Sequence, residues 1–183
     1  MDTITDMPGG YKLELTGLSE VLNKIDVRQF EEDVTLELDA FGKDVARDAK
    51  DNLSKNKTND EGYLTNSIGS ESEKLSVSIF ANADYAAYVE FGTRKFAAAY
   101  VASLPAEWKV FAAQFKGSGG SGSFEEFVMR LAGWCKRKGV DEKAAYAIAR
   151  SILINGIKAQ PYLFPAFEKN RSLLIKNLQN LFK

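Results

Sequence analysis

A long amphipathic helix in the first third of the chain constrains the fold more than any other feature. Its apolar residues recur at steps of three and four, at Val34, Leu38, Phe41, Val45, Ala49 and Leu53. Its opposite face is charged, with Glu37, Lys43, Asp44, Arg47, Asp48 and Lys50. This spacing predicts one helix that begins near Asp26, where Gln29 completes a capping box, and that ends before the turn-forming residues 56–62.

Short strands and helices are predicted on either side of this helix. Leu75, Val77 and Ile79 alternate with Lys74, Ser76 and Ser78, which is the best strand pattern in the chain. The other predictions are a strand over 11–15, a short helix over 17–25, an extended segment over 63–68, and a short helix over 85–91 that Gly92 ends.

Most of residues 96–158 is predicted to be helical. One helix covers 105–115, a second begins at a Ser123–Glu126 capping box and ends near Gly139, and a third runs from Asp141 to Gly156. Pro161 suits the first turn of a last helix. Few strands, several helices and no strand–helix alternation favour an α+β fold. We expect a long N-terminal helix and a C-terminal helix packed on a small, mostly antiparallel sheet, with a helical insertion.

Composition excludes several kinds of site. The chain has 183 residues, 45% of them hydrophobic, with a net charge of −1, one cysteine and no histidine. Without histidine there is no Ser-His-Asp or Cys-His arrangement and no imidazole metal ligand. Cys135 alone closes no internal disulfide, which fits a reducing compartment. No apolar run is long enough to span a membrane, and the first residues lack a secretory pattern.

Three patterns that could carry chemistry have simpler interpretations. The glycines of 117–122 have dinucleotide-loop spacing, with Asp141 19 residues after Gly122, but a helix precedes them instead of a strand. Asp44 and Asp48 share a helix face, yet basic residues interleave with them as on a solvated surface. Glu90 lies between aromatic residues, where Asp84 is the only local candidate for the second carboxylate of a glycosidase, and it is interpreted as an anchor for backbone amides or for a base such as Arg94. We therefore expect no catalytic residue, cofactor or metal.

A basic run follows an aromatic residue near the end of one predicted helix. Lys136, Arg137 and Lys138 could contact nucleic acid, with Trp134 beside them. Basic residues at a helix end also complement the helix dipole, and Trp134 falls on the apolar stripe, where it would belong to the core. Both interpretations stay open at this point.

Two separated motifs carry a resemblance to a known family. The first is YAAYVEFGTR at 85–94, and the second is AQPYLFPAF at 159–167. Together with a weaker match, GYLTNSI at 62–68, they resemble the tail-completion, or neck, proteins of long-tailed phages, typified by gene product ten of phage Hong Kong 97. The resemblance spans roughly residues 28–180 and departs from many members by the roughly sixty residues between the two motifs.

The resemblance implies a single tail-completion-like domain over 1–183, with a helical insertion at 97–158. It also implies a structural virion protein, made in the host cytoplasm, that forms a homo-oligomeric ring at the head–tail junction. Such a ring would contact head-completion or connector proteins and the tail terminator or tail tube, and genomic DNA would pass through its lumen without sequence-specific contacts. Alternatives are a tail terminator, a head–tail connector, a metal-dependent nuclease or a DNA-binding regulator.

The two motifs also supply the residues expected to matter. They are expected to form interfaces or structural turns, and changes at Glu90, Arg94 or Phe164 are expected to leave heads and tails unjoined. A DNA contact in the lumen is expected at Lys136, Arg137 and Lys138. The interface or structural residues are Tyr85, Tyr88, Glu90, Phe91, Gly92, Thr93, Arg94, Pro161, Phe164 and Pro165.

Overall fold

The computed structural model describes residues 3–4, 10–14, 27–56, 62–115 and 123–181 and has the predicted α+β class. It divides into two compact units, one made of residues 1–86 with 161–183 and the other of residues 87–160. We call them the first and the second unit. The predicted short helix over 17–25 and the glycines of 117–122 lie outside the described residues. No described helix is both long and apolar enough to cross a membrane.

The first unit is built around α1 (Val27–Lys55), which confirms the long helix. The predicted apolar stripe is fully buried, with Leu38, Val45 and Ala49 completely inaccessible to solvent. One residue assigned to the charged face is misplaced. Asp48 is buried, because it turns toward the C-terminal helix and finds hydrogen-bond donors there.

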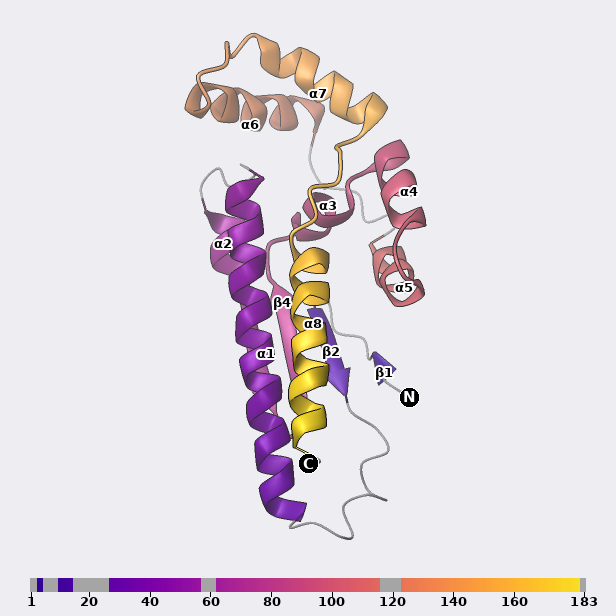
Figure 1. Ribbon diagram of the computed structural model, residues 1–183. Helices are drawn as coiled ribbons and strands as arrows, with labels where there is room; N and C mark the ends of the chain where they lie inside the picture. Colours follow the sequence, from indigo (N-terminus) through magenta and orange to yellow (C-terminus); the bar gives the residue numbers. More distant parts are fainter. Residues whose placement is uncertain (1–2, 5–9, 15–26, 57–61, 116–122, 182–183) are drawn as a thin grey trace. The chain divides into compact units, whose positions relative to one another are not determined.

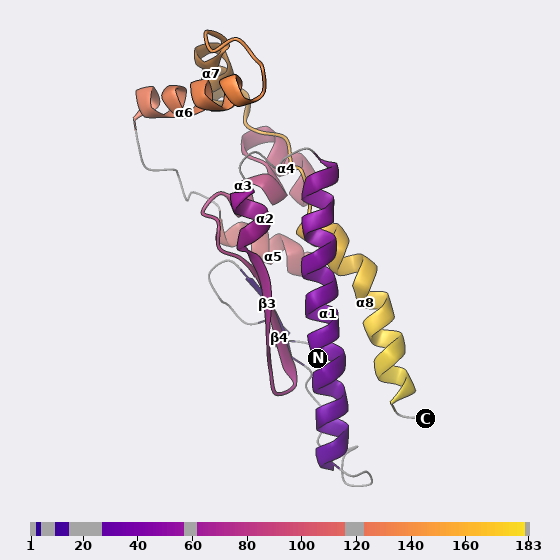
Figure 2. The same ribbon diagram turned by 90° about the vertical axis from the view of Figure 1, so that its left-hand side faces the viewer.

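An antiparallel sheet lies against α1. Its strands are β1 (Thr3–Ile4), β2 (Gly10–Glu14), β3 (Ile68–Glu73) and β4 (Ser76–Ala81), in the order β1-β2-β4-β3. Figures 1 and 2 show β3 and β4 along the length of α1. The contact is tight at Gly42, where an added Cβ would come within 2.4 Å of the Val77 side chain. Glycine at this helix position therefore lets the sheet approach α1.

Two details of the strand prediction are wrong. Leu75 belongs to the two-residue turn between β3 and β4, where its φ of 59° leaves the extended region, so the buried alternation starts at Val77. Residues 63–67 form a helical turn, α2 (Tyr63–Ser67), instead of an extended segment. The helix places Leu64 in the core and lets the Ser67 hydroxyl donate to the Leu64 carbonyl, a local bond that extended backbone would not offer.

The C-terminal helix α8 (Leu163–Asn180) runs antiparallel to α1 and packs along it (Figure 1). Phe41 and Phe167 meet edge to face, with ring centroids 5.5 Å apart. The helix begins two residues after Pro161, so Pro165 and not Pro161 occupies its first turn. The carbonyls before the helix are instead held by α1, because Asn52 donates to Tyr162 O at 3.0 Å and Asn56 donates to Pro161 O at 3.3 Å.

The described part of the second unit contains helices and connecting turns but no strand. Its elements are α3 (Ala86–Phe91), whose first residue falls in the first unit, α4 (Arg94–Ala102), α5 (Ala106–Gln114), α6 (Phe124–Arg137) and α7 (Ala144–Asn155). The Ser123–Glu126 capping box is confirmed, and positive φ values at Gly139 and Gly156 confirm where α6 and α7 end. Asp141 does not start α7. It accepts a hydrogen bond from the Lys143 amide in the turn before that helix.

Candidate functional site

The first signature motif forms α3 and the turn that ends it. Gly92 has a φ of 72°, and its amide donates to Tyr88 O at 3.0 Å, which closes the helix as the sequence predicts. Thr93 is extended, and Arg94 takes a φ of 53°, which is uncommon for a residue with a side chain. Three consecutive residues thus follow a path that ordinary helix or strand geometry would not produce.

This turn is joined to the segment that follows α7. The Thr93 amide donates to Ile157 O at 2.9 Å, and the Ile157 amide donates back to the Thr93 hydroxyl at 2.7 Å. Three residues later, the Gln160 amide donates to Val89 O at 2.8 Å. We call this arrangement of residues 89–94 and 156–160 the motif junction. It confirms that residues before the second signature motif return beside the first.

Two glycines make the motif junction possible. A Cβ on Gly92 would lie 2.6 Å from Ala159 N, and a Cβ on Gly156 would lie 2.3 Å from Thr93 O. Gly156 has a φ of 88° and a ψ of −177°, a region that only glycine populates readily. Each glycine therefore leaves room for the opposite backbone and adopts dihedral angles that other residues avoid. This explains why the first motif has glycine directly before Thr93.

The aromatic residues of the first motif have different environments. Phe91 is buried and packs with Trp108, Phe111 and Phe115 at centroid distances of 6.5, 5.9 and 6.2 Å. Tyr88 is half-buried. Tyr85 is exposed, because it lies just before α3 beside the ring of Tyr63, itself 60% exposed. The motif therefore contributes one core anchor, Phe91, and one member of an exposed aromatic pair, Tyr85.

Glu90 is 2% exposed, which agrees with an anchoring role rather than an accessible acid. Burial, and then the charge of Glu90, raise the pKa of the nearby Tyr100 phenol far above its usual value. Tyr100 is thus neutral at any physiological pH. Its hydroxyl has no hydrogen-bond partner within the part of the chain that the structure describes.

The carboxylates on α1 are engaged by basic groups. Arg47 pairs with Asp44 at 2.8 Å, and Lys169 pairs with Asp48 at 2.8 Å. Within the described ranges, no three His, Cys, Asp or Glu side chains are grouped so that they could hold a metal ion. Asp44 therefore belongs to an ion pair within α1, and Asp48 belongs to the contact between α1 and α8.

The basic run lies at the end of α6. Lys136, Arg137 and Lys138 are exposed, whereas Cys135 beside them is fully buried. Trp134, which falls on the predicted apolar stripe, is half-buried and not fully buried. The run therefore lies on the surface of the second unit.

The second signature motif splits between the units. Tyr162 and Leu163 are buried in the first unit, Phe164 is half-buried, and Pro165 is exposed. From the sequence, Gly156 is predicted only as a helix end, and Ile157 and Gln160 are not among the expected residues. Glycine at the helix end is a usable signal, whereas the backbone contacts of the other two leave no trace in side-chain patterns.

Comparison with protein families gives a match to the first part of the chain. Residues 18–92, fewer than half of the 183, match the family described as "HK97-gp10_like: Bacteriophage HK97-gp10, putative tail-component". The match covers α1, α2, the β3–β4 hairpin and α3 up to Gly92. No curated protein and no solved structure matches the chain.

Proposed function

We propose, from the match of residues 18–92 to this family of bacteriophage tail components, that the chain is the neck, or tail-completion, subunit that joins the tail to the DNA-filled head. The observation that carries the proposal is the agreement of this match with the first signature motif, which ends in the Gly92 turn. The chain acts through its shape and its interfaces, and it catalyses no reaction.

A ring of identical subunits at the head–tail junction is the assembly we propose. A ring closes when each subunit offers two different, complementary surfaces. Exposed large apolar side chains suited to such surfaces occur in both units, among them Leu36, Leu173 and Ile175 in the first, and Val110, Met129 and Ile154 in the second. Along the axis of the ring, its neighbours would be head-completion or connector proteins on one side and the tail terminator or tube on the other.

We further propose that residues 97–158 form a helical insertion in a single tail-completion domain. The exposed basic run Lys136, Arg137 and Lys138 would contact the phosphates of the DNA that passes through the lumen. Contacts to phosphates carry no sequence information, which suits a channel for a whole genome.

The position of the chain in the virion tests this proposal. In a phage that encodes the chain, antibody raised against the purified protein and visualised with gold particles should label the junction between head and tail. The matched control is antibody against the major tail-tube protein of the same phage after partial tail disruption. Labelling along the tail or at its distal tip, with the junction unlabelled, would refute the proposal.

A further inference from the structure

The two units carry opposite charge. The second unit, residues 87–160, has eleven Lys and Arg against six Asp and Glu, a net charge of +5. The first unit has thirteen basic against nineteen acidic residues, a net charge of −6. The near-zero charge of the whole chain therefore hides a strong asymmetry, which would attract unlike units of two copies to one another.

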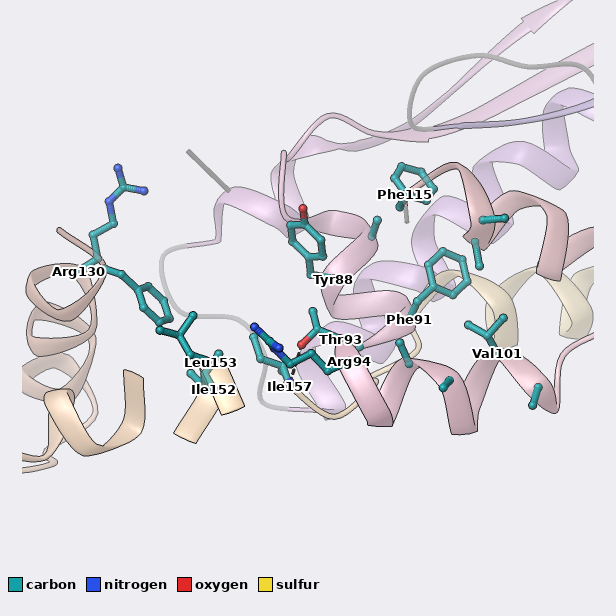
Figure 3. A pocket seen from close by; sticks show the side chains of 18 of the residues that line it. Tyr88, Phe91, Thr93, Arg94, Val101, Phe115, Arg130, Ile152, Leu153 and Ile157 are labelled. Atoms are coloured by element: carbon teal, nitrogen blue, oxygen red, sulfur yellow. Dashed lines mark hydrogen bonds between the residues drawn. The ribbon is translucent and has the colours of Figure 1, made fainter. Parts of the chain in front are cut away.

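The second unit contains a large apolar groove of about 1260 Å³. Side chains from α6 and α7 line one part of it, and side chains from α3, α4 and α5 line the other (Figure 3). Its apolar residues include Phe91, Phe127 and Leu153. We call it the basic groove, because Arg94, Lys109 and Arg130 line it and Glu126 is the one carboxylate among its described lining residues.

The size of the basic groove favours a macromolecular occupant. Pockets for small molecules measure roughly 300–1,000 Å³, and this groove is larger. An apolar side chain of the occupant would pack against its apolar residues, and carboxylates around that side chain would pair with its basic residues. The fitting occupant is an exposed apolar residue framed by acids on a regular element.

The outer face of α1 has this chemistry. Leu36 is 66% exposed, although it lies in the middle of the N-terminal half of a long helix. Glu32 and Asp33 precede it by four and three residues, and Asp39 follows it by three, so all three share its face of the helix. Two of these carboxylates have basic partners on α1, since Arg28 pairs with Glu32 at 3.3 Å and Lys43 pairs with Asp39 at 2.6 Å. Exposed pairs of this kind contribute little stability, so the carboxylates can turn to a new basic partner. We call Glu32, Asp33, Leu36 and Asp39 the acidic patch.

We propose that the acidic patch of one copy docks in the basic groove of the next copy. The two surfaces are different, so the contact is heterologous and repeats from copy to copy until a ring closes. This inference rests on the proposed function for its biological setting, and it names the partner surface that the ring would use.

Two charge-reversed variants of the full chain test the contact. The groove variant is Lys109→Glu with Arg130→Glu, and the patch variant is Glu32→Lys with Asp33→Lys. We expect the wild-type chain to form oligomers larger than a dimer by sedimentation at low salt, and each variant alone to be monomeric. An equimolar mixture of the two variants should associate again, because each acidic patch then meets a basic groove and each basic patch meets an acidic groove.

Matched controls separate this contact from general charge effects. Lys143→Glu with Arg150→Glu makes the same charge change on exposed residues of the second unit outside the groove, and it should leave association unchanged. Circular dichroism should show the wild-type melting temperature for both charge-reversed variants, since all four replaced side chains lie outside the buried core. Raising the salt from roughly 20 to roughly 500 mM should weaken wild-type association about tenfold or more.

Three results would overturn the proposal. They are a wild-type chain that stays monomeric at about 100 µM, variants that associate as the wild type does, and a mixture that stays monomeric. Duplex DNA binding lost only in the groove variant, with self-association intact, would assign the groove to nucleic acid instead. None of these results changes where the gold particles label the virion. Failure of this contact can therefore be distinguished from failure of the proposed function.

Discussion

Replacing Gly156 by alanine is expected to lower the free energy of unfolding of the second unit by about 3 kcal/mol or more. Two costs add at this position. The backbone occupies a region that alanine enters only with strain of about 1–3 kcal/mol. The new methyl group would also lie 2.3 Å from Thr93 O, a backbone atom that cannot move without breaking the motif junction.

Thermal and urea unfolding, followed by circular dichroism, would measure this loss, and hydrogen exchange at the Thr93 and Ile157 amides would locate it. Gly139→Ala is the matched control, because Gly139 also has a positive φ, of 69°, but no described atom lies within 4 Å of the place that an added Cβ would take. The control should lose only about 1 kcal/mol. Equal losses in the two variants would mean that the close contact with Thr93 has no energetic weight.

Replacing Asp48 by alanine is expected to destabilise the first unit by about 2–3 kcal/mol. The carboxylate accepts from Asn170 Nδ2 and from Lys169 Nζ, both at 2.8 Å, and links α1 to α8. The change would leave part of the buried Asn170 amide without its acceptor. Asp44→Ala on the same helix is the control and should cost less than about 1 kcal/mol, because Asp44 makes a partly exposed pair with Arg47.

Asp48 should also make stability depend on pH. Burial alone would raise the pKa of its carboxyl, but hydrogen bonds from Lys169 and Asn170, together with nearby positive charge, hold the pKa below its usual value. A lowered pKa means that the stabilisation is complete above about pH 4 and is lost as the pH falls through the folded-state pKa. Unfolding midpoints of wild type and Asp48→Asn should therefore converge below about pH 4. A constant difference down to about pH 2 would contradict this assignment.

The sequence predicts most of the first unit because its elements repeat a clear period. The stripe from Val34 to Leu53 fixes α1, and the alternation at Val77 and Ile79 fixes β4. The prediction fails where a contact with a distant helix determines whether a side chain is buried. Asp48 fits a charged face by spacing alone, and only α8 explains its burial.

The motif junction shows a second limit of sequence reasoning. The Gly92 turn is predictable, since glycine is the usual residue at a helix end. Its partner lies more than sixty residues away and contributes backbone atoms of Ile157 and Gln160, which any residue type except proline could supply. Similarly, the exposed position of Tyr85 depends on where α3 begins, and the hydrophobic pattern of 85–91 does not mark that boundary.

The most direct test of the central claim is an electron-microscope count of particles in lysates of a phage that encodes the chain and carries a nonsense mutation in its gene. We expect DNA-filled heads and complete tails in normal numbers but unjoined, with joining restored when purified wild-type chain is added. Infectious particles with heads and tails joined at the normal frequency, in the absence of the chain, would contradict the claim.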